Sequence, residues 1–208
     1  HGSTELAEVL RIYQAEGLVS CFQFRNEVEM AHAGTALRWV YGEPCAVVTS
    51  IGPGAFQAMA GSLTAASNGV GVYHIYGDET THGEGYNMQQ VPKPAQGLFG
   101  QITAAMGQSY TLHTPQALRD ALRRGAGAVF HPWKAGPFFL NLPLNTQPAP
   151  VTLRLDALPV RPDIGSLIQA DADAFETAAD LIVGAERPAI KAGGGTRGSA
   201  EALRAFAE

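Results

Sequence analysis

The sequence predicts an α/β fold, with a mostly parallel β-sheet covered by helices on both faces. Segments with apolar residues at helical spacing alternate along the chain with short, continuous apolar runs. Such runs are typical of parallel strands, because parallel strands are buried on both faces. The 24 glycines and 13 prolines indicate many short connections, which suit a layered α/β arrangement better than a helical bundle.

The part of the chain up to residue 76 is expected to alternate helices with strands. Apolar spacing predicts helices over residues 6–13, 33–41 and about 55–67, with Gly42 ending the second of them. Compact apolar runs predict strands over residues 20–24, 45–49 and 70–76. Cys21 and Cys45 fall in two of these runs, so both are expected to be buried, reduced thiols.

Between residues 77 and 107 the sequence has no clear period and is rich in glycine, proline and polar residues. We expect a long functional loop there, with room for one short helix. A further helix is expected to begin at Thr114-Pro115 and to end at Arg123-Arg124, before Gly125. The next apolar run predicts a strand over residues 138–142.

Three parts are expected along the chain: a first domain over residues 1–145, a linker over 146–164, and the beginning of a second α/β domain over 165–208. The linker is rich in proline, which favours an extended chain. The patterns beyond it predict a helix over 175–183, a strand over 188–192 and a last helix after Ser199. So short a segment buries little apolar surface alone, and we therefore expect the second domain to be incomplete in this chain.

Composition disfavours two classes of partner. The formal net charge of -5 leaves no basic patch for a polyanion, so nucleic acid is not expected to bind. No apolar stretch approaches the ~20 residues that cross a bilayer, so no membrane partner is expected. The start, His1-Gly2-Ser3, lacks the basic and apolar regions of a signal peptide, and a cytoplasmic location is expected.

Several short motifs follow one another between residues 25 and 54. They are Arg25-Asn26-Glu27 with Met30-Ala31-His32-Ala33, then Gly42-Glu43-Pro44, then Thr49-Ser50-Ile51-Gly52-Pro53-Gly54. In this order and spacing they resemble the pyrimidine-binding domain of the acetolactate synthase-like thiamine-diphosphate enzymes. The resemblance covers most of residues 1–145, and residues 186–195 resemble the opening of that family's central domain. Taken alone, Glu27 has a simpler interpretation, because a glutamate in a first helical turn favours the helix dipole.

The resemblance implies a catalytic role for Glu27. In the family, the matching glutamate hydrogen-bonds N1′ of the cofactor's aminopyrimidine ring and favours its imino tautomer. The imino nitrogen then removes the proton from C2 of the thiazolium, which gives a nucleophilic ylide. By the same resemblance, Glu27 and five further residues shape the cofactor site. These five are Gly2, Ser50, Gly52, Pro53 and Gly54.

Other site residues follow from the resemblance with less support from the sequence itself. His1-Gly2-Ser3 matches the loop after the family's first strand, which places His1 next to the substrate. The same three residues are also consistent with the remnant of a tag. If they are genuine, the first strand and helix of the domain are missing. Gln89 or Gln90 matches a substrate-facing glutamine. His74, His82 and Glu84 have no spacing typical of a dedicated metal site, so no metal ligand is assigned.

The resemblance also implies what else the enzyme needs. Family members hold the diphosphate and its Mg²⁺ in a third domain, whose motifs do not occur in this sequence. The chain alone is therefore expected to bind the cofactor weakly and to be inactive. Family members place the active site at a subunit interface, so a homodimer or homotetramer is expected.

The function expected from the resemblance is to make or cleave a C–C bond next to a carbonyl, with a 2-oxo acid or a diketone as substrate. Arg25-Asn26-Glu27 with Met30-Ala31-His32 also resembles a ring-cleaving hydrolase of the inositol pathway, which acts on a cyclohexane-dione. An alternative of another class is a noncatalytic or split-subunit module that only binds the pyrimidine. The sequence leaves all three open.

Overall fold

The computed structural model describes residues 2–83, 95–161 and 171–208. The chain divides into two compact units, His1–Pro162 and Asp163–Glu208, and each is described by itself.

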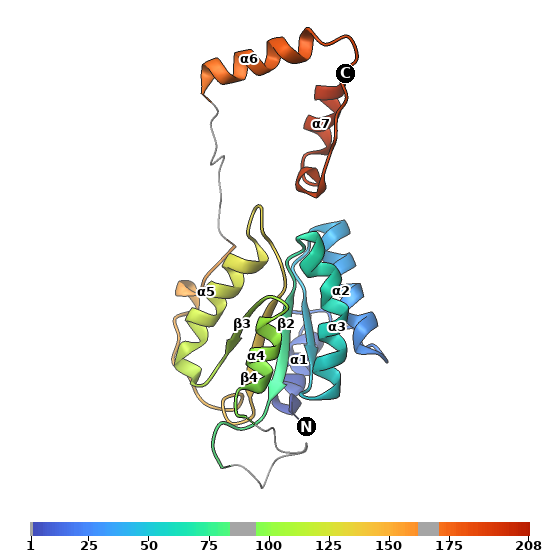
Figure 1. Cartoon of the computed structure of the whole chain (residues 1–208). Coiled ribbons are helices and arrows are strands. Elements are labelled where there is room, and N and C mark those ends of the chain that lie inside the picture. The colour runs from blue at the N-terminus through green and yellow to red at the C-terminus, as the bar shows by residue number, and fades with distance from the viewer. Residues whose placement is uncertain (1, 84–94, 162–170) are drawn as a thin grey trace. The chain divides into compact units, whose positions relative to one another are not determined.

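The first unit is built on a four-stranded parallel sheet, in the order β1-β2-β4-β3 (Figure 1). Its strands are β1 (Ala46–Thr49), β2 (Tyr73–Asp78), β3 (Gln108–Thr111) and β4 (Phe138–Pro143). The parallel α/β fold class expected from the sequence is therefore confirmed. The strand expected over 70–76 begins three residues later, at Tyr73.

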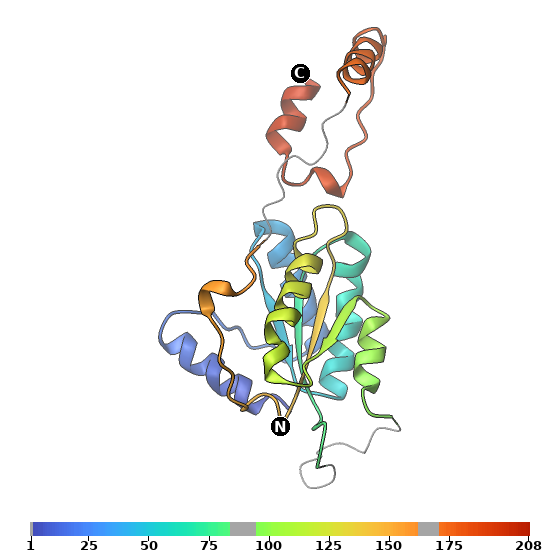
Figure 2. The ribbon, with the colours of Figure 1, turned by 90° about the vertical axis from the view of Figure 1, so that its left-hand side faces the viewer.

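Helices cover both faces of this sheet, as Figure 2 shows. They are α1 (Thr4–Ala15), α2 (Glu27–Tyr41), α3 (Pro53–Asn68), α4 (Leu98–Ala104) and α5 (Leu118–Val129), with short 3₁₀ turns η1 (Pro115–Ala117) and η2 (Leu155–Ala157). Helices α3 and α4 lie against one face, with α2 packed on α3, and α5 lies against the other. As expected, α2 ends at Gly42, whose positive φ of 72° suits a glycine.

The core alternates across the sheet along β4. Phe139 joins the cluster under α3 and α4, together with Val47, Val72 and Tyr76. Its neighbours Phe138 and Leu140 join the second cluster, under α5. Successive side chains of a strand point to opposite faces, so one strand supplies both layers. Each such fully buried side chain stabilises the fold by about 1.5–3 kcal/mol.

The prediction of a strand over residues 20–24 is wrong. The segment has no regular secondary structure, and within the described residues it pairs with no strand. The Cys21 N–H donates to Gln14 Oε1 (2.8 Å), and the Phe22 side chain is 76% exposed. Cys21 is accordingly an exposed thiol, not a buried one, and Cys45 is only half-buried. A strand needs a ladder partner, which an apolar run alone does not supply.

Helix α5 is longer than expected, because it continues through Gly125 to Val129. Arg123-Arg124 therefore lies inside the helix, where the Arg124 guanidinium stacks over the Tyr110 ring (5.6 Å). A Cβ on Gly125 would lie 2.7 Å from Tyr73 Cε1, so the glycine lets the helix approach the sheet closely. This packing stabilises the helix and outweighs the low helix propensity of glycine.

The second unit contains α6 (Ala172–Val183), a 3₁₀ turn η3 (Gly194–Thr196) and α7 (Ala200–Ala207). Both expected helices are present. The prediction of a strand over residues 188–192 is wrong, since the described part of this unit contains no strand with which that segment could pair. No described residue of the unit is buried, which agrees with the small amount of core that so short a segment forms.

A buried histidine lies inside the core on β2. His74 Nδ1 lies 2.9 Å from Tyr76 Oη, and the His74 ring packs against Phe139 (5.0 Å between ring centroids). Burial lowers the pKa of His74 to about 3 and raises the pKa of Tyr76. The histidine is therefore neutral in the folded protein at neutral pH.

The burial of neutral His74 makes the free energy of unfolding depend on pH. The unfolded histidine binds a proton below about pH 6.5, whereas the folded one does not until about pH 3. The contribution of neutral His74 is thus fully present above pH 6.5 and is lost as the pH falls from 6.5 towards 3. At pH 5 we expect His74 to lower the free energy of unfolding by roughly 2 kcal/mol relative to pH 7. Urea unfolding of wild type and His74→Phe at both pH values measures this.

The His74→Phe protein should be less stable at pH 7, because it leaves the Tyr76 hydroxyl without its buried partner, but its stability should fall less between pH 7 and 5. The exposed His113 provides the control, and His113→Gln should keep the wild-type pH dependence. An unchanged pH dependence in His74→Phe would show that His74 is not the group responsible.

Candidate functional site

The candidate site lies at the carboxyl edge of the sheet. Strand β1 ends at Thr49 and leads through Ser50–Gly52 into α3, while α2 begins at Glu27. In parallel α/β folds this edge is where ligands bind, because the loops between strands and helices meet there. The sequence motifs at Glu27 and at residues 49–54 are thus brought together.

Glu27 is the first residue of α2, and its carboxylate does not cap the helix. The residue before it, Asn26, is the N-cap, whose Oδ1 accepts hydrogen bonds from the N–H groups of Val28 (2.8 Å) and Glu29 (3.3 Å). No hydrogen bond or ion pair joins the half-buried Glu27 side chain to any residue in the described part of the chain. A favourable interaction with the helix dipole, which is the simpler interpretation of Glu27, needs no hydrogen bond and leaves the carboxylate available for a ligand.

The Gly-Pro-Gly turn brings backbone close to that carboxylate. A Cβ on Gly54 would lie 2.6 Å from Thr49 Oγ1 and 3.1 Å from Glu27 Oε1. Pro53 is the first residue of α3, and Gly52 before it has a φ of 77°, which favours glycine. The hydroxyl of Thr49 and the carboxylate of Glu27 therefore both lie beside the bare Cα of Gly54.

Gly2 reaches the same edge from the start of the chain. It is buried, and a Cβ on it would lie 3.1 Å from Ser50 Oγ. A Cβ on Gly77, near the end of β2, would lie 1.9 Å from the Gly2 carbonyl oxygen, so the two backbones are in direct contact. Gln147 Nε2 donates a hydrogen bond to the same oxygen (2.7 Å). Gly2 is therefore held next to Ser50.

Not every residue expected in the site can be placed. The residues that the sequence predicts for the cofactor site, Gly2, Glu27, Ser50 and Gly52-Pro53-Gly54, lie at the same end of the sheet. His1, Gln89 and Gln90 lie outside the described residues, as does Glu84. Gln147 was not predicted from the sequence, because it falls in the expected linker 146–164. Only its distance from Gly2 in the fold reveals it.

The loop after β2 is attached to the turn after β4. Asn145 Oδ1 accepts from the Thr81 N–H (2.9 Å), and Asn145 Nδ2 donates to Thr81 Oγ1 (3.0 Å). The Gln96 side chain donates to the Thr81 carbonyl from the far end of the same loop (3.1 Å). The turn at residues 145–147 thus contacts the loop after β2 through Asn145 and Gly2 through Gln147.

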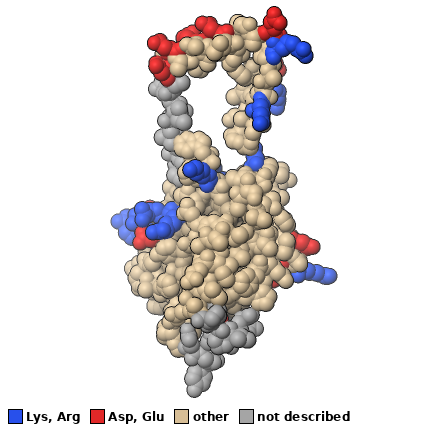
Figure 3. Space-filling model, in the orientation of Figure 1, with Lys and Arg blue, Asp and Glu red and all other residues tan. Residues whose placement is uncertain are grey.

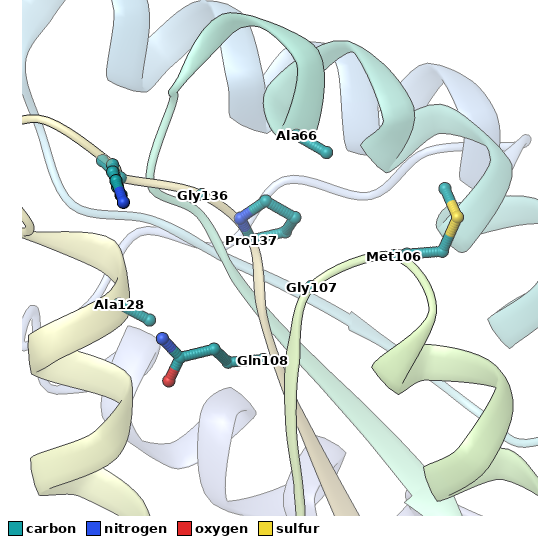
Figure 4. A pocket seen from close by; sticks show the side chains of 9 residues that line it. Ala66, Met106, Gly107, Gln108, Ala128, Gly136 and Pro137 are labelled. Carbon is teal, nitrogen blue, oxygen red and sulfur yellow. The ribbon is translucent and has the colours of Figure 1, made fainter.

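A hollow of about 210 Å³ lies at the amino ends of β3 and β4, at the opposite edge of the sheet (Figure 4). It is lined by Ala66, Met106, Gly107, Gln108, Ala128, Lys134, Ala135, Gly136 and Pro137. Its residues come from α3, α5, the first residue of β3 and the connections before β3 and β4. None of the predicted site residues lines it.

Charge and composition of the described chain add little to the site. Figure 3 shows a face of the first unit on which charged side chains are sparse. The described residues bring together no group of three or more His, Cys, Asp or Glu side chains that could hold a metal ion. Within residues 2–83, 95–161 and 171–208, no helix is long and apolar enough to span a bilayer.

Comparison with known proteins agrees with this geometry. Residues 2–98 match the family described as "Thiamine pyrophosphate enzyme, N-terminal TPP binding domain". The fold resembles a solved structure from Mycobacterium smegmatis described as a thiamin diphosphate-dependent enzyme, with a TM-score of 0.57 and 16% identity over 79% of this chain and 30% of that one. Residues 2–98 thus match the N-terminal TPP-binding domain of the thiamine pyrophosphate enzymes, and this match includes the motifs between residues 25 and 54.

Two curated relatives indicate which enzymes the chain resembles in sequence. An acetolactate synthase large subunit of Parasynechococcus marenigrum is 27% identical over 219 residues, covering 97% of this chain and 32% of that protein. A 3D-(3,5/4)-trihydroxycyclohexane-1,2-dione hydrolase of Bacillus subtilis is 26% identical over 217 residues, covering 94% and 32%. The resemblance to the acetolactate synthase-like family is confirmed. The chain spans about a third of the length of these relatives.

Proposed function

We propose that this chain is the pyrimidine-binding part of an acetolactate synthase-like enzyme that makes or cleaves a C–C bond next to the carbonyl of a 2-oxo acid. One observation carries the proposal: the Glu27 carboxylate, unused by its own helix, lies beside the bare backbone of Gly54. The matched family and the acetolactate synthase relative support the same activity.

The residues present fit the aminopyrimidine ring of thiamine diphosphate. A flat ring needs backbone that can approach it closely, and a side chain at Gly54 would occupy the space beside Glu27 Oε1. Glu27 supplies a carboxyl group for a ring nitrogen, and Gly2, Ser50 and the 52–54 turn would border the ring. When bound, thiamine diphosphate supplies a carbon nucleophile that attacks carbonyl groups and accepts the electrons of the broken C–C bond.

The role proposed for Glu27 is to hold a proton at N1′ of that ring. A carboxyl group both donates and accepts a proton at neutral pH when its partner is a basic ring nitrogen, which an amide or a hydroxyl does not do. The N-terminal position on α2 fixes the carboxyl group on a rigid element, and Asn26 satisfies the neighbouring N–H groups. Glu27 can therefore exchange a proton without the helix end losing its cap.

We also propose that Mg²⁺ and the diphosphate are bound by a region outside the matched motifs, and that the active site lies between subunits of a homodimer or homotetramer. Exposed large apolar side chains support the interface, because such side chains in quantity mark contact surfaces. They lie on the segment after α1 and on α2, and include Leu18, Phe22, Val40 and Tyr41.

A second candidate reaction is hydrolytic cleavage of a cyclohexane-dione ring. It is favoured by the similarity to the Bacillus subtilis hydrolase, which equals that to the acetolactate synthase within a percentage point. A noncatalytic pyrimidine-binding module is less favoured, because the Glu27 carboxylate is available for proton transfer.

Substrate tests on the full-length protein, with thiamine diphosphate and Mg²⁺, separate these candidates. We expect pyruvate to be consumed with release of CO₂, measured by a coupled CO₂ assay and by NMR of the product. Ring opening of a cyclohexane-1,2-dione without CO₂ release would favour the hydrolase instead. If the protein binds the cofactor but converts neither substrate class, the noncatalytic module is correct and the proposed activity is wrong.

A further inference from the structure

We infer that Gln147 is a positioning residue that holds the Gly2 backbone in place for the cofactor's pyrimidine ring. The link to the cofactor rests on the proposed function. The hold of Gln147 on the Gly2 backbone, called the clamp below, rests on contacts within the chain.

One side-chain amide joins two parts of the chain that are far apart in sequence. Gln147 Nε2 donates to the Gly2 carbonyl (2.7 Å) and to the Leu142 carbonyl (2.9 Å). Both hydrogens of the amide nitrogen are thus used, one on the segment before α1 and one on β4. The Gln147 Oε1 atom is buried and has no partner among the described residues, so the contacts of this side chain depend on its donor end.

The segment that follows Gly2 packs loosely, whereas Gly2 itself is buried. Helix α1, which follows it, has no buried residue, so its own packing constrains the segment weakly. Gly2 itself is buried against Gly77, whose lack of a side chain permits the contact, and it lies next to Ser50. Contact alone does not orient a glycine backbone, whereas a directed hydrogen bond to its carbonyl does.

The geometry therefore connects Gln147 to the site through Gly2. If the amide is lost, the Gly2 segment is free to move away from Ser50, while Glu27, on a different element, keeps its place. This predicts a loss of cofactor affinity with little change in the chemistry of Glu27.

The sharpest variant is Gln147→Glu, which keeps the size of the side chain but replaces the donor with an acceptor. A carboxylate would then face two carbonyl oxygens and repel both. Thr146→Val is the matched control. It removes a hydroxyl of the same turn, which donates to the Pro143 carbonyl (2.9 Å) and not to the Gly2 carbonyl.

Two readouts test the inference on the full-length protein. Hydrogen exchange measured by mass spectrometry, without cofactor, should become faster in the peptide that begins at Gly2 in Gln147→Glu, and not in Thr146→Val. The Kd for thiamine diphosphate with Mg²⁺, measured by calorimetry, should rise roughly 10-fold in Gln147→Glu, because a hydrogen bond of this kind is lost. In Thr146→Val the Kd should stay within about twofold of wild type.

Unchanged exchange in Gln147→Glu would overturn the clamp. Faster exchange with an unchanged Kd would overturn the link to the cofactor and leave the proposed function standing. Equal effects of both variants would show a general loss of stability and would also overturn the inference. If wild type binds no thiamine diphosphate, the proposed function and the link to the cofactor both fail, and the exchange result alone decides the clamp.

Discussion

Exchange of the C2 proton of bound thiamine diphosphate should slow by roughly 100-fold or more when Glu27 is replaced by glutamine. The amide keeps the size of the side chain and can still contact the ring nitrogen, but it cannot hand over an ionisable proton. Glu27 makes no hydrogen bond within the described chain, so the free energy of unfolding should change by less than about 0.5 kcal/mol. Quenched hydrogen–deuterium exchange, read by proton NMR on the full-length protein, measures the rate.

Glu29→Gln is the matched control for this prediction. Glu29 lies in the same first turn of α2, is exposed, and contributes equally to the charge at the helix start. Its exchange rate should equal that of wild type. A wild-type rate in Glu27→Gln, or an equal slowing in Glu29→Gln, would remove Glu27 from the mechanism.

Gly54→Ala should weaken binding of thiamine diphosphate by roughly 10–100-fold, since small misplacements in a site have large effects. Its Cβ would lie 2.6 Å from Thr49 Oγ1, in a residue that is only 8% exposed, and 3.1 Å from Glu27 Oε1. Thr49 has little room to move, so either the first turn of α3 shifts or the Glu27 carboxylate is displaced. The clash should cost about 1–3 kcal/mol, more than alanine gains over glycine within a helix. Calorimetry and urea unfolding measure the two effects.

Two further variants make this prediction sharper. Gly127→Ala lies within α5 with nothing within 4 Å of the added Cβ, so it should stabilise the protein by about 0.5–1 kcal/mol and leave cofactor affinity unchanged. Removing the nearer clash with Thr49→Ala in the Gly54→Ala background should restore part of the stability. Wild-type affinity in Gly54→Ala would show that the ring does not lie beside this glycine.

Much of the fold could be predicted because its signals are local. Gly42 ended α2 as expected, since its positive φ is a property of that one residue. Pro53 and the glycines around it marked the start of α3 in the same way. The parallel sheet followed from apolar runs such as Phe138–Pro143, which is buried on both faces.

The errors share a physical cause, which is that strands depend on partners. Residues 20–24 and 188–192 are apolar enough for strands but have none to pair with in the described chain. In contrast, β3 was missed because Gln108–Thr111 is short and polar, and it forms a strand only by pairing with β4. Local composition shows neither that the two apolar segments lack a partner strand nor that Gln108–Thr111 pairs with β4.

In the candidate site, too, local motifs could be predicted from the sequence, whereas contacts between distant segments could not. Glu27 and the turn at residues 52–54 were predicted because each lies within a motif of adjacent residues. Gln147 was not, because its role depends on a contact with Gly2, 145 residues away. A residue that acts by holding another segment leaves no pattern in its own neighbourhood.

The most direct test of the central claim is a crystal structure of the full-length protein with thiamine diphosphate and Mg²⁺. We predict that a Glu27 carboxylate oxygen lies within hydrogen-bonding distance of N1′, with the ring beside the Gly54 backbone. A pyrimidine ring bound away from the carboxyl edge of the sheet, or one whose N1′ contacts another residue, would contradict the account.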